Sequence, residues 1–425
     1  MQSISKLSCS VFFLLVMTGY GGYAQNSVNS PYSRFGLGDI HHQGFVRNMA
    51  MGGISFGLRN PKSIDYVNPA SFSARDTMSF LFDFAMQGKR NSLNTGELKS
   101  ASSDFNFRHL ALAFPITKWL GTSVGITPYS TMSYSLLEQE TVEDLGQVNF
   151  TYRGEGNLSR FYLGAGARLG KYFSLGLSMN YLFGNLERGT RVSFPDDDYA
   201  AETLISYKLQ ARGIYMSYGA QFILPLPENY FFHAGALFEN ETGISGNLTH
   251  FNQYILSPGE GSATYDTLIN ETSERDLLLP TRMGFGISAG KTNHFTVGAD
   301  YSRENWSPHV LPGLTDSLTT SQSFRVGLEF IPDASGINSY FSTVRYRLGG
   351  YYHLGYLKIR EEQIKDFGIT FGLGLPLPRT NNTFNVAFQL GRRGSLSHEL
   401  IRETYGTISF SLTLYDFWFI KYKFD

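Results

Sequence analysis

The sequence predicts an all-β fold: a transmembrane antiparallel β-barrel of about 14 strands with an N-terminal plug inside the lumen. Three observations predict it. From residue 77 onward, apolar side chains alternate with small or polar ones, as in strands whose two faces meet different surroundings. Aromatic residues and glycine are abundant, with 35 Phe, 26 Tyr and 45 Gly, whereas only 17% of residues are charged. The connections between strands alternate between short and long, as in outer-membrane barrels.

The first 24 residues have the features of a secretory signal peptide. Lys6 supplies a positive charge, Val11 to Met17 form an apolar core, and Gly22-Tyr23-Ala24 is a small-x-small cleavage site. We expect the mature chain to begin at Gln25, without the single cysteine, Cys9. No later apolar run approaches the roughly 20 residues that a spanning helix needs. An exported barrel is therefore expected in the outer membrane of a Gram-negative cell.

Residues 25–76 differ from the rest of the chain. They are rich in Gly, Asn, Ser and Pro and show little alternation. A barrel of 14 strands is wider than side chains can fill, since about 8 strands already enclose a small ligand. We therefore expect residues 25–76 to fold back inside as a plug (hatch), residues 77–417 to form the barrel, and residues 418–425 to form a short periplasmic tail or strand end.

Period-2 alternation locates the individual strands. A clear example is Phe173, Leu175, Leu177, Met179 and Tyr181, which alternate with polar or small residues. The strands are centred near residues 82, 110, 127, 163, 180, 215, 235, 284, 298, 326, 346, 370, 387 and 410. In the second strand the phase slips around Arg108 to Leu110, which predicts a β-bulge there.

The lengths of the connections indicate how the barrel is oriented. Short turns are expected at 117–118, 170–171, 225–229, 291–293, 332–339 and 376–381, and the longest loop at about 240–276. Short turns face the periplasm in such barrels, and long loops face outward. An even number of strands then places both ends of the barrel on the periplasmic side.

The polar faces of the strands carry charges that we expect to face the lumen. A soluble core would not tolerate so many charges, whereas a water-filled lumen would. The alternative is a soluble β-sandwich with a solvated polar face, but a sandwich gives no reason for long and short loops to alternate. The lumen-facing charged residues are Asp83, Arg160, Arg168, Asp300, Arg325, Glu329, Arg345 and Arg347.

Three stretches resemble the FadL family of outer-membrane transporters for long-chain fatty acids and other hydrophobic compounds. The plug holds Met51-Gly52-Gly53 and Asn68-Pro69-Ala70, similar to the family's glycine-rich opening and Asn-Pro-Ala motif. The stretch from Leu279-Pro280 through Asp300 to Asn305-Trp306-Ser307 resembles a family hairpin. Glycine-spaced strands around 159–183 and 340–375 also fit the family. The chain departs from it at Lys423-Phe424-Asp425, since barrels commonly end on an aromatic residue.

Pro128 lies in the middle of the third predicted strand. Proline has no N–H for the ladder, and an unpaired backbone group in lipid costs about several kcal/mol. We interpret Pro128 as a kink that opens the wall sideways, because the resemblance implies a lateral opening at the third strand with the Asn-Pro-Ala motif nearby. In this hypothesis Asn68, Pro69 and Ala70 form the gate. The alternative is a bulge near the membrane rim.

The sequence offers no catalytic residue, and we expect neither a metal nor a cofactor. Two Gly-x-Ser-x-Gly matches, at 53–57 and 286–290, lack the strand–turn–helix context of a nucleophile elbow. The nine histidines show no metal-binding spacing. A hydrolase on the barrel rim would need a serine and a histidine within hydrogen-bond reach, and His109, His233 and His353 lie on predicted strands. We therefore expect that the protein is not an enzyme.

The expected function is passage of small hydrophobic compounds such as fatty acids through a plug-gated lumen, with membrane lipids and a small hydrophobic ligand as partners. Nucleic acid is excluded, because the net charge is −1 and the chain has no long basic run. The alternative function is protein secretion or surface attachment, since some FadL-like barrels act as shuttles in type IX secretion. The protein partner in that case is unknown.

Overall fold

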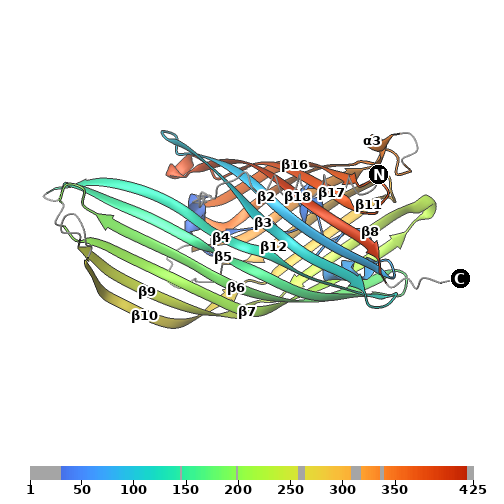
Figure 1. Cartoon of the computed structure of the whole chain (residues 1–425), viewed down its shortest axis with the longest axis horizontal. Helices are drawn as coiled ribbons and strands as arrows, with labels where there is room; N and C mark the ends of the chain where they lie inside the picture. Colours follow the sequence, from blue (N-terminus) through green and yellow to red (C-terminus); the bar gives the residue numbers. More distant parts are fainter. Residues whose placement is uncertain are drawn as a thin grey trace, which may run out of the picture.

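The computed structural model describes residues 30–418, except 144–145, 198–199, 257–263, 308–316 and 336–338. They form one antiparallel sheet that closes into a barrel of 14 strands (Figure 1). The predicted strand number is confirmed. The wall consists of β2 (Ser79–Asn94), β3 (Lys99–Pro115), β4 (Leu120–Val142), β5 (Gly146–Leu169), β6 (Phe173–Ser193), β7 (Glu202–Pro225), β8 (Tyr230–Glu239) continued by β9 (Thr242–Leu256), β10 (Thr264–Leu279) continued by β11 (Arg282–Lys291), β12 (Phe295–Asn305), the short β13 (Ser317–Leu318) with β14 (Thr320–Phe330), β15 (Arg345–Ile359), β16 (Glu362–Pro376), β17 (Thr383–Arg393) and β18 (Arg402–Phe417).

The barrel closes between its last and first strands, where β18 pairs with β2 from Arg402↔Asn94 to Phe417↔Ser79. Five of the six predicted short turns are confirmed, at 116–119, 170–172, 226–229, 292–294 and 377–382. The turn at 226–229 contains η3 (Pro227–Asn229), and the connection between β17 and β18 contains η4 (Ser397–Glu399). The sixth connection, 331–344, is longer and contains the helical turn α3 (Tyr340–Thr343).

The predicted long loop at 240–276 is wrong, because β9 and β10 pair with each other there as a hairpin. Its alternation is weak for a physical reason. These strands lie beyond the apolar part of the wall, so both of their faces carry polar residues. The predicted bulge in the second strand is confirmed, because Arg108 is the extra residue between the pairs Ala85↔His109 and Met86↔Phe107.

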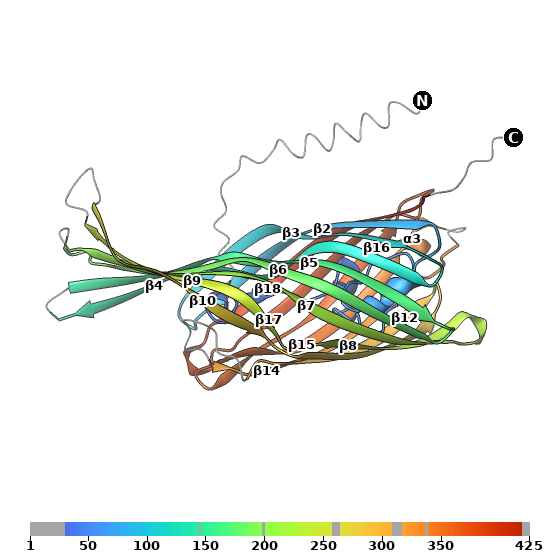
Figure 2. The ribbon, with the colours of Figure 1, turned by 90° about the horizontal axis from the view of Figure 1, so that it is seen from below.

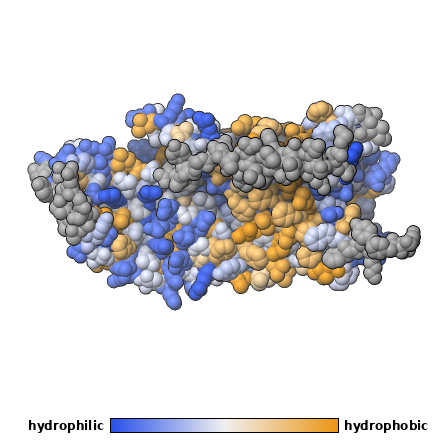
Figure 3. Space-filling model, viewed as in Figure 1, coloured by the Kyte–Doolittle hydropathy of each residue, from blue (hydrophilic) through white to orange (hydrophobic). Residues whose placement is uncertain are grey.

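Exposed apolar side chains from strands around the barrel form a belt on the half that carries the short turns, and the part of it on the face shown in Figure 3 is orange. Large apolar side chains in it are strongly exposed, for example Phe285 at 56%, Val326 at 58% and Ile369 at 61%. A soluble protein rarely exposes so continuous an apolar surface. Hydrocarbon around the belt removes this cost, as in outer-membrane barrels.

Six strands continue well beyond the belt. β5 and β7 have 24 residues each, about twice the roughly 9–11 that cross a bilayer. With β4, β6, β9 and β10 they form a curved sheet, here called the extension, that projects past the rest of the barrel (Figures 1 and 2). Its surface is mostly polar in Figure 3.

Residues 30–76, here called the N-terminal segment, lie within the ring of strands (Figure 2). The segment contains η1 (Pro31–Arg34), β1 (Asp39–Ile40), α2 (Val46–Met49) and η2 (Pro69–Ala74), joined by irregular stretches. Among the described residues, no helix is both long and apolar enough to cross a membrane. The expected signal peptide, 1–24, and residues 419–425 of the expected tail lie outside the described residues.

Candidate functional site

Rows of glycine on the inner wall make room for the N-terminal segment. Gly166, Gly176 and Gly219 are cross-strand neighbours on β5, β6 and β7. A Cβ atom on Gly176 would stand 2.2 Å from the carbonyl carbon of Pro69, and one on Gly219 would stand 2.2 Å from Asn68 Oδ1. The segment therefore approaches the wall backbone closely enough to exclude any side chain at these positions.

The Asn-Pro-Ala motif lies directly on this row of glycines. Asn68 caps η2, because its Oδ1 accepts a hydrogen bond from the Ala70 amide at 3.1 Å. Its Nδ2 donates to the Phe56 carbonyl at 2.8 Å, and the residue is fully buried. The motif thus holds two parts of the segment together and seats them on β5 to β7.

Two of the predicted lumen-facing carboxylates fasten the segment to the opposite wall. Asp300 Oδ2 accepts hydrogen bonds from the amides of Ser55 at 2.6 Å and Phe56 at 3.0 Å. Glu329 accepts from Arg47 of α2 at 3.0 Å and from Arg347 of the neighbouring strand at 2.7 Å. Arg347 also donates to Asn385 at 2.9 Å, so Glu329 bridges the segment and the wall through two guanidinium groups.

The other predicted lumen charges have varied surroundings. Asp83 contacts His109 Nε2 at 2.6 Å, and Arg160 donates to the Tyr215 hydroxyl at 3.1 Å while lying 4.7 Å from the centre of the Tyr66 ring. Arg168 is exposed, whereas Arg325 and Arg345 are half-buried.

A water-filled lumen was expected for these charges, and this is wrong for five of them. Asp83, Arg160, Asp300, Glu329 and Arg347 are each at most 6% exposed. The physical reason is that the interior is packed: the N-terminal segment donates hydrogen bonds to Asp300 and Glu329, and the other three side chains bond to neighbouring wall residues. Alternation in the wall locates the inward charges, but it does not reveal what lies against them.

The segment itself carries a buried acid. Asp65 is 6% exposed and receives hydrogen bonds from Asn48 Nδ2 at 3.1 Å and the Val67 amide at 3.1 Å. Burial raises the pKa of Asp65 to about 7, although both hydrogen bonds favour its charged form.

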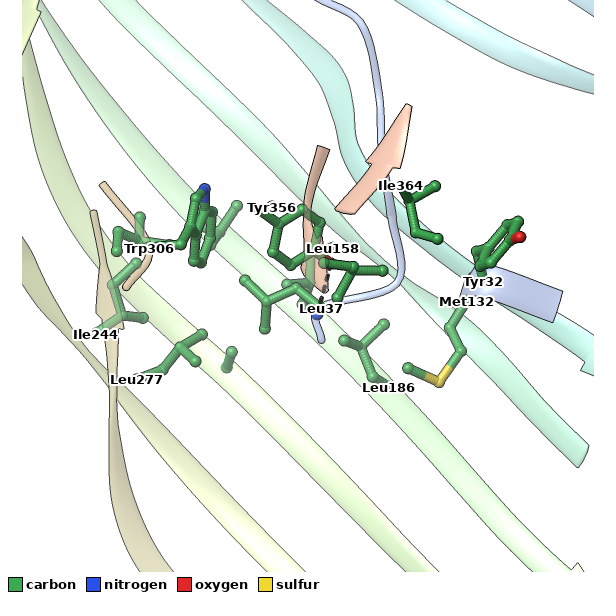
Figure 4. Close-up of a cluster of buried hydrophobic side chains, with 14 of the residues drawn as sticks. Tyr32, Leu37, Met132, Leu158, Leu186, Ile244, Leu277, Trp306, Tyr356 and Ile364 are labelled. Atoms are coloured by element: carbon green, nitrogen blue, oxygen red, sulfur yellow. Dashed lines mark hydrogen bonds between the residues drawn. The ribbon is translucent and has the colours of Figure 1, made fainter. Parts of the chain in front are cut away.

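An apolar cluster crosses the barrel beside the extension (Figure 4). Leu37 of the segment lies between Leu158 and Leu186 on one side and Tyr356 on the other. The Tyr356 hydroxyl accepts from the Leu37 amide at 3.1 Å and donates to the Gly38 carbonyl at 2.8 Å. Trp306, from the FadL-like Asn-Trp-Ser stretch, is fully buried and packs on Tyr356 with ring centres 4.9 Å apart.

The ladder between β3 and β4 is short. It runs from Pro115↔Gly121 to Leu110↔Ile126 and stops there, while both strands continue. The last pair, Leu110↔Ile126, lies two residues before Pro128. Both strands are irregular just beyond this pair: β3 has the bulge at Arg108, and β4 has a register shift between Pro128 and Ser130. We call this unpaired stretch of the wall the seam.

The N-terminal segment enters the seam. β1 pairs antiparallel with β4 through Asp39↔Thr131 and Ile40↔Ser130, and the His41 amide donates to the Tyr129 carbonyl at 2.9 Å. β1 therefore occupies the place along β4 that β3 leaves empty.

A cavity of about 660 Å³ opens at the seam. Its lining includes lumen residues such as Gln389 and Tyr405 and also Arg153 and Glu155, whose side chains are 62% and 68% exposed. Pro128 and Phe107 line it as well. The lining of the cavity therefore includes both buried lumen residues and exposed residues, and it is partly polar and partly apolar.

The structure does not bring the Asn-Pro-Ala motif to Pro128. Pro128 pairs with Ser159 of β5, whereas the motif lies on Gly166, seven residues further along that strand or about 23 Å away. The residues of the segment that lie beside Pro128 are 39–42, all of which line the same cavity. Sequence reasoning did not find them, and the only available signal is the adjacent His41-His42 pair.

Among the described residues, Ser323 Oγ lies 2.6 Å from His353 Nδ1 in a partly buried contact. The nearby Asp366 contacts His42 at 3.2 Å instead of His353, so the three groups of a triad are not aligned. Within the described residues, no group of three or more His, Cys, Asp or Glu side chains is arranged to hold a metal ion.

Solved structures share this architecture. The Ralstonia pickettii toluene transporter TbuX has a TM-score of 0.60 at 15% identity, with 88% of this chain and 99% of that chain covered. The Pseudomonas putida toluene transporter TodX has a TM-score of 0.59 at 14% identity, covering 90% and 99%. A Pseudomonas aeruginosa FadL homologue has a TM-score of 0.59 at 10% identity, covering 90% and 100%. The likeness establishes a FadL-like barrel fold.

No curated protein matches the sequence. The family model described as BamG matches residues 4–425, which is nearly the entire sequence. The chain therefore belongs to the BamG family.

Proposed function

We propose that this barrel passes small hydrophobic compounds across the outer membrane, with the N-terminal segment as its plug and the seam as its lateral exit. The single observation that carries the proposal is the cavity at the seam, which is lined both by buried lumen residues such as Tyr405 and by Pro128. The neighbours TbuX and TodX, described as toluene transporters, support this function by their fold.

The chemistry of the seam suits an amphipathic or apolar molecule. On one side, the seam borders the exposed aromatic residues Phe105 and Phe107 of β3, which are 55% and 39% exposed. On the other side lie the polar Ser133 and Ser135 of β4. Burial of each CH₂ group of a ligand contributes roughly 0.8 kcal/mol, so an alkyl or aryl group would partition from water into such an opening.

The N-terminal segment supports a plug function because it lies within the ring of strands and contacts the wall through non-covalent interactions only. Its contacts with the wall are hydrogen bonds and ion pairs, such as those of Asp300 and Glu329, and close packing on glycine. Asn68, Pro69 and Ala70 would serve as the seat of the plug in this proposal. A partial displacement of residues 39–42 would widen the seam while that seat stays in place.

The test is uptake of the neutral fluorophore N-phenylnaphthylamine by a Gram-negative host that produces the barrel. Asn106 on β3 lines the cavity, so Asn106→Trp should obstruct it and lower the uptake rate several-fold. Ser103→Trp on the same strand does not line the cavity and is the matched control. Equal uptake in cells with and without the barrel would reject the proposed function.

A second candidate, a role in protein secretion or surface attachment, is favoured by the extension. Within the described residues, β10 pairs only with β9, and β4 beyond Ser133 pairs only with β5. Such unpaired edges accept additional strands from other chains. Photo-crosslinking from Thr272, on the β10 edge, in whole cells tests this role: a single specific protein adduct, together with no uptake of the fluorophore, would favour it over transport.

A further inference from the structure

Strand β1 is held differently on its two sides. Toward β4 it has backbone pairing, supplemented by a bond between His41 Nε2 and Thr131 Oγ1 at 2.9 Å. Toward the other side, no backbone ladder joins it to β3 within the described part of the chain. That side is held by side chains alone.

Asp39 provides the strongest of these side-chain contacts. Its Oδ1 pairs with Arg393 of β17 at 2.6 Å, and its Oδ2 lies 3.6 Å from Lys89 of β2. Arg108, at the bulge of β3, adds a hydrogen bond to the His42 carbonyl. Both charged partners, Lys89 and Arg393, also line the seam cavity. Asp39 therefore connects β1 across the cavity to the part of the wall beyond β3.

We propose that β1 is the gate of the seam and that Asp39 is its latch. This inference rests on the proposed function, because it assigns the moving part of the same lateral exit. β1 has only two residues, so it can leave β4 without unfolding a wall strand. When β1 leaves β4, the volume vacated by β1 adds to the seam cavity. The edge of β4 at Tyr129–Ser133 then becomes exposed. Asp39 opposes that departure through Arg393 and Lys89.

A reversible disulfide locks the proposed gate. His41 and Tyr129 form the hydrogen-bonded pair, so the neighbouring Ile40 and Ser130 form the closer, non-hydrogen-bonded pair. Such pairs have Cα atoms about 4.5 Å apart, within the range of about 4.4–6.8 Å that a disulfide spans. The mature chain is expected to contain no cysteine, so Ile40→Cys with Ser130→Cys would form the only disulfide.

The experiment measures N-phenylnaphthylamine uptake by cells that carry the locked barrel. Oxidation should lower the rate at least tenfold, and dithiothreitol should restore it. The matched control joins Thr249 to Thr272 on the extension, whose hydroxyls are 3.0 Å apart. Oxidation of Thr249→Cys with Thr272→Cys should leave uptake within twofold. Unchanged uptake in the oxidised gate variant would overturn the inference while leaving the proposed function intact.

A second measurement does not depend on transport. Asp39→Asn removes the latch charge, so the His41 amide should exchange hydrogen at least tenfold faster than in the parent protein. The amides of β4 at Val124 and Gly125, in the intact ladder with β3, should not change. If the parent barrel admits no fluorophore, the proposed function fails, and this exchange difference still decides whether Asp39 holds β1. Equal exchange at His41 in both proteins would reject the latch.

Discussion

Removal of one charge from the buried Arg47–Glu329–Arg347 group should loosen the N-terminal segment strongly. Glu329→Gln keeps the shape of the side chain but leaves two guanidinium groups without their carboxylate, and the Arg47 and Arg347 side chains are only 9% and 0% exposed. Breaking a buried ion pair by removing one partner costs about 3–5 kcal/mol. Since 1.4 kcal/mol is about a factor of ten, hydrogen exchange in α2 should accelerate by roughly a hundred-fold to several thousand-fold.

The matched control is the same substitution in an exposed pair. Glu399 contacts Arg360, and their side chains are 85% and 54% exposed. A surface pair contributes about 0–1 kcal/mol, so Glu399→Gln should leave α2 unchanged. Hydrogen exchange followed by mass spectrometry on peptides covering 44–58, in lipid nanodiscs, measures both variants. If these peptides exchange hydrogen at the same rate in the Glu329→Gln and Glu399→Gln variants, the reasoning fails.

Three further predictions concern the segment and the belt. Asp300→Ala should leave the buried amides of Ser55 and Phe56 without an acceptor, at a cost in stability of about 1–3 kcal/mol each. Asp300→Asn should cost less, because the Asn side-chain oxygen can still accept a hydrogen bond. Hydrogen exchange at these two amides should therefore be faster in Asp300→Ala than in Asp300→Asn, and equal rates in the two variants would contradict the role assigned to Asp300. Because the pKa of Asp65 is raised from an ordinary 3.8 to about 7, the docked segment binds more protons between these values, so its docking should weaken as pH rises from about 4 to 7. Asp65→Asn should remove that pH dependence, which exchange measured at pH 4, 5.5 and 7 detects. Ile369→Arg, on the belt, should lower the free energy of unfolding of the barrel in lipid vesicles by about 2–4 kcal/mol. A urea titration measures this, and an unchanged free energy of unfolding would argue against contact between Ile369 and hydrocarbon.

The wall of the barrel was predictable because its signal is local. Alternation around Phe173 to Tyr181 identifies a strand from neighbouring residues only, and the slip at Arg108 identified a bulge in the same way. The extension was missed because outside the belt both faces of a strand meet water, so β9 and β10 carry no such alternation.

The candidate site was only partly predictable. The register shift after Pro128 agrees with the chemistry of proline, and the seam lies beside it. The sequence also marked Asn68-Pro69-Ala70, but the structure seats this motif on the glycine row of β5 to β7, away from the seam. The residues beside Pro128 belong to β1, whose two residues are too few for any periodic pattern.

The sequence by itself determined which side chains of the wall face lipid and which face inward, because alternation is a property of each strand alone. Only the tertiary structure decided what the inward residues meet. Arg47 and Glu329 are 282 residues apart in the chain, and Ile40 and Ser130 are neighbours only after the barrel closes around the segment. Contacts of this kind depend on the closure of the whole sheet, so no local pattern in the chain records them.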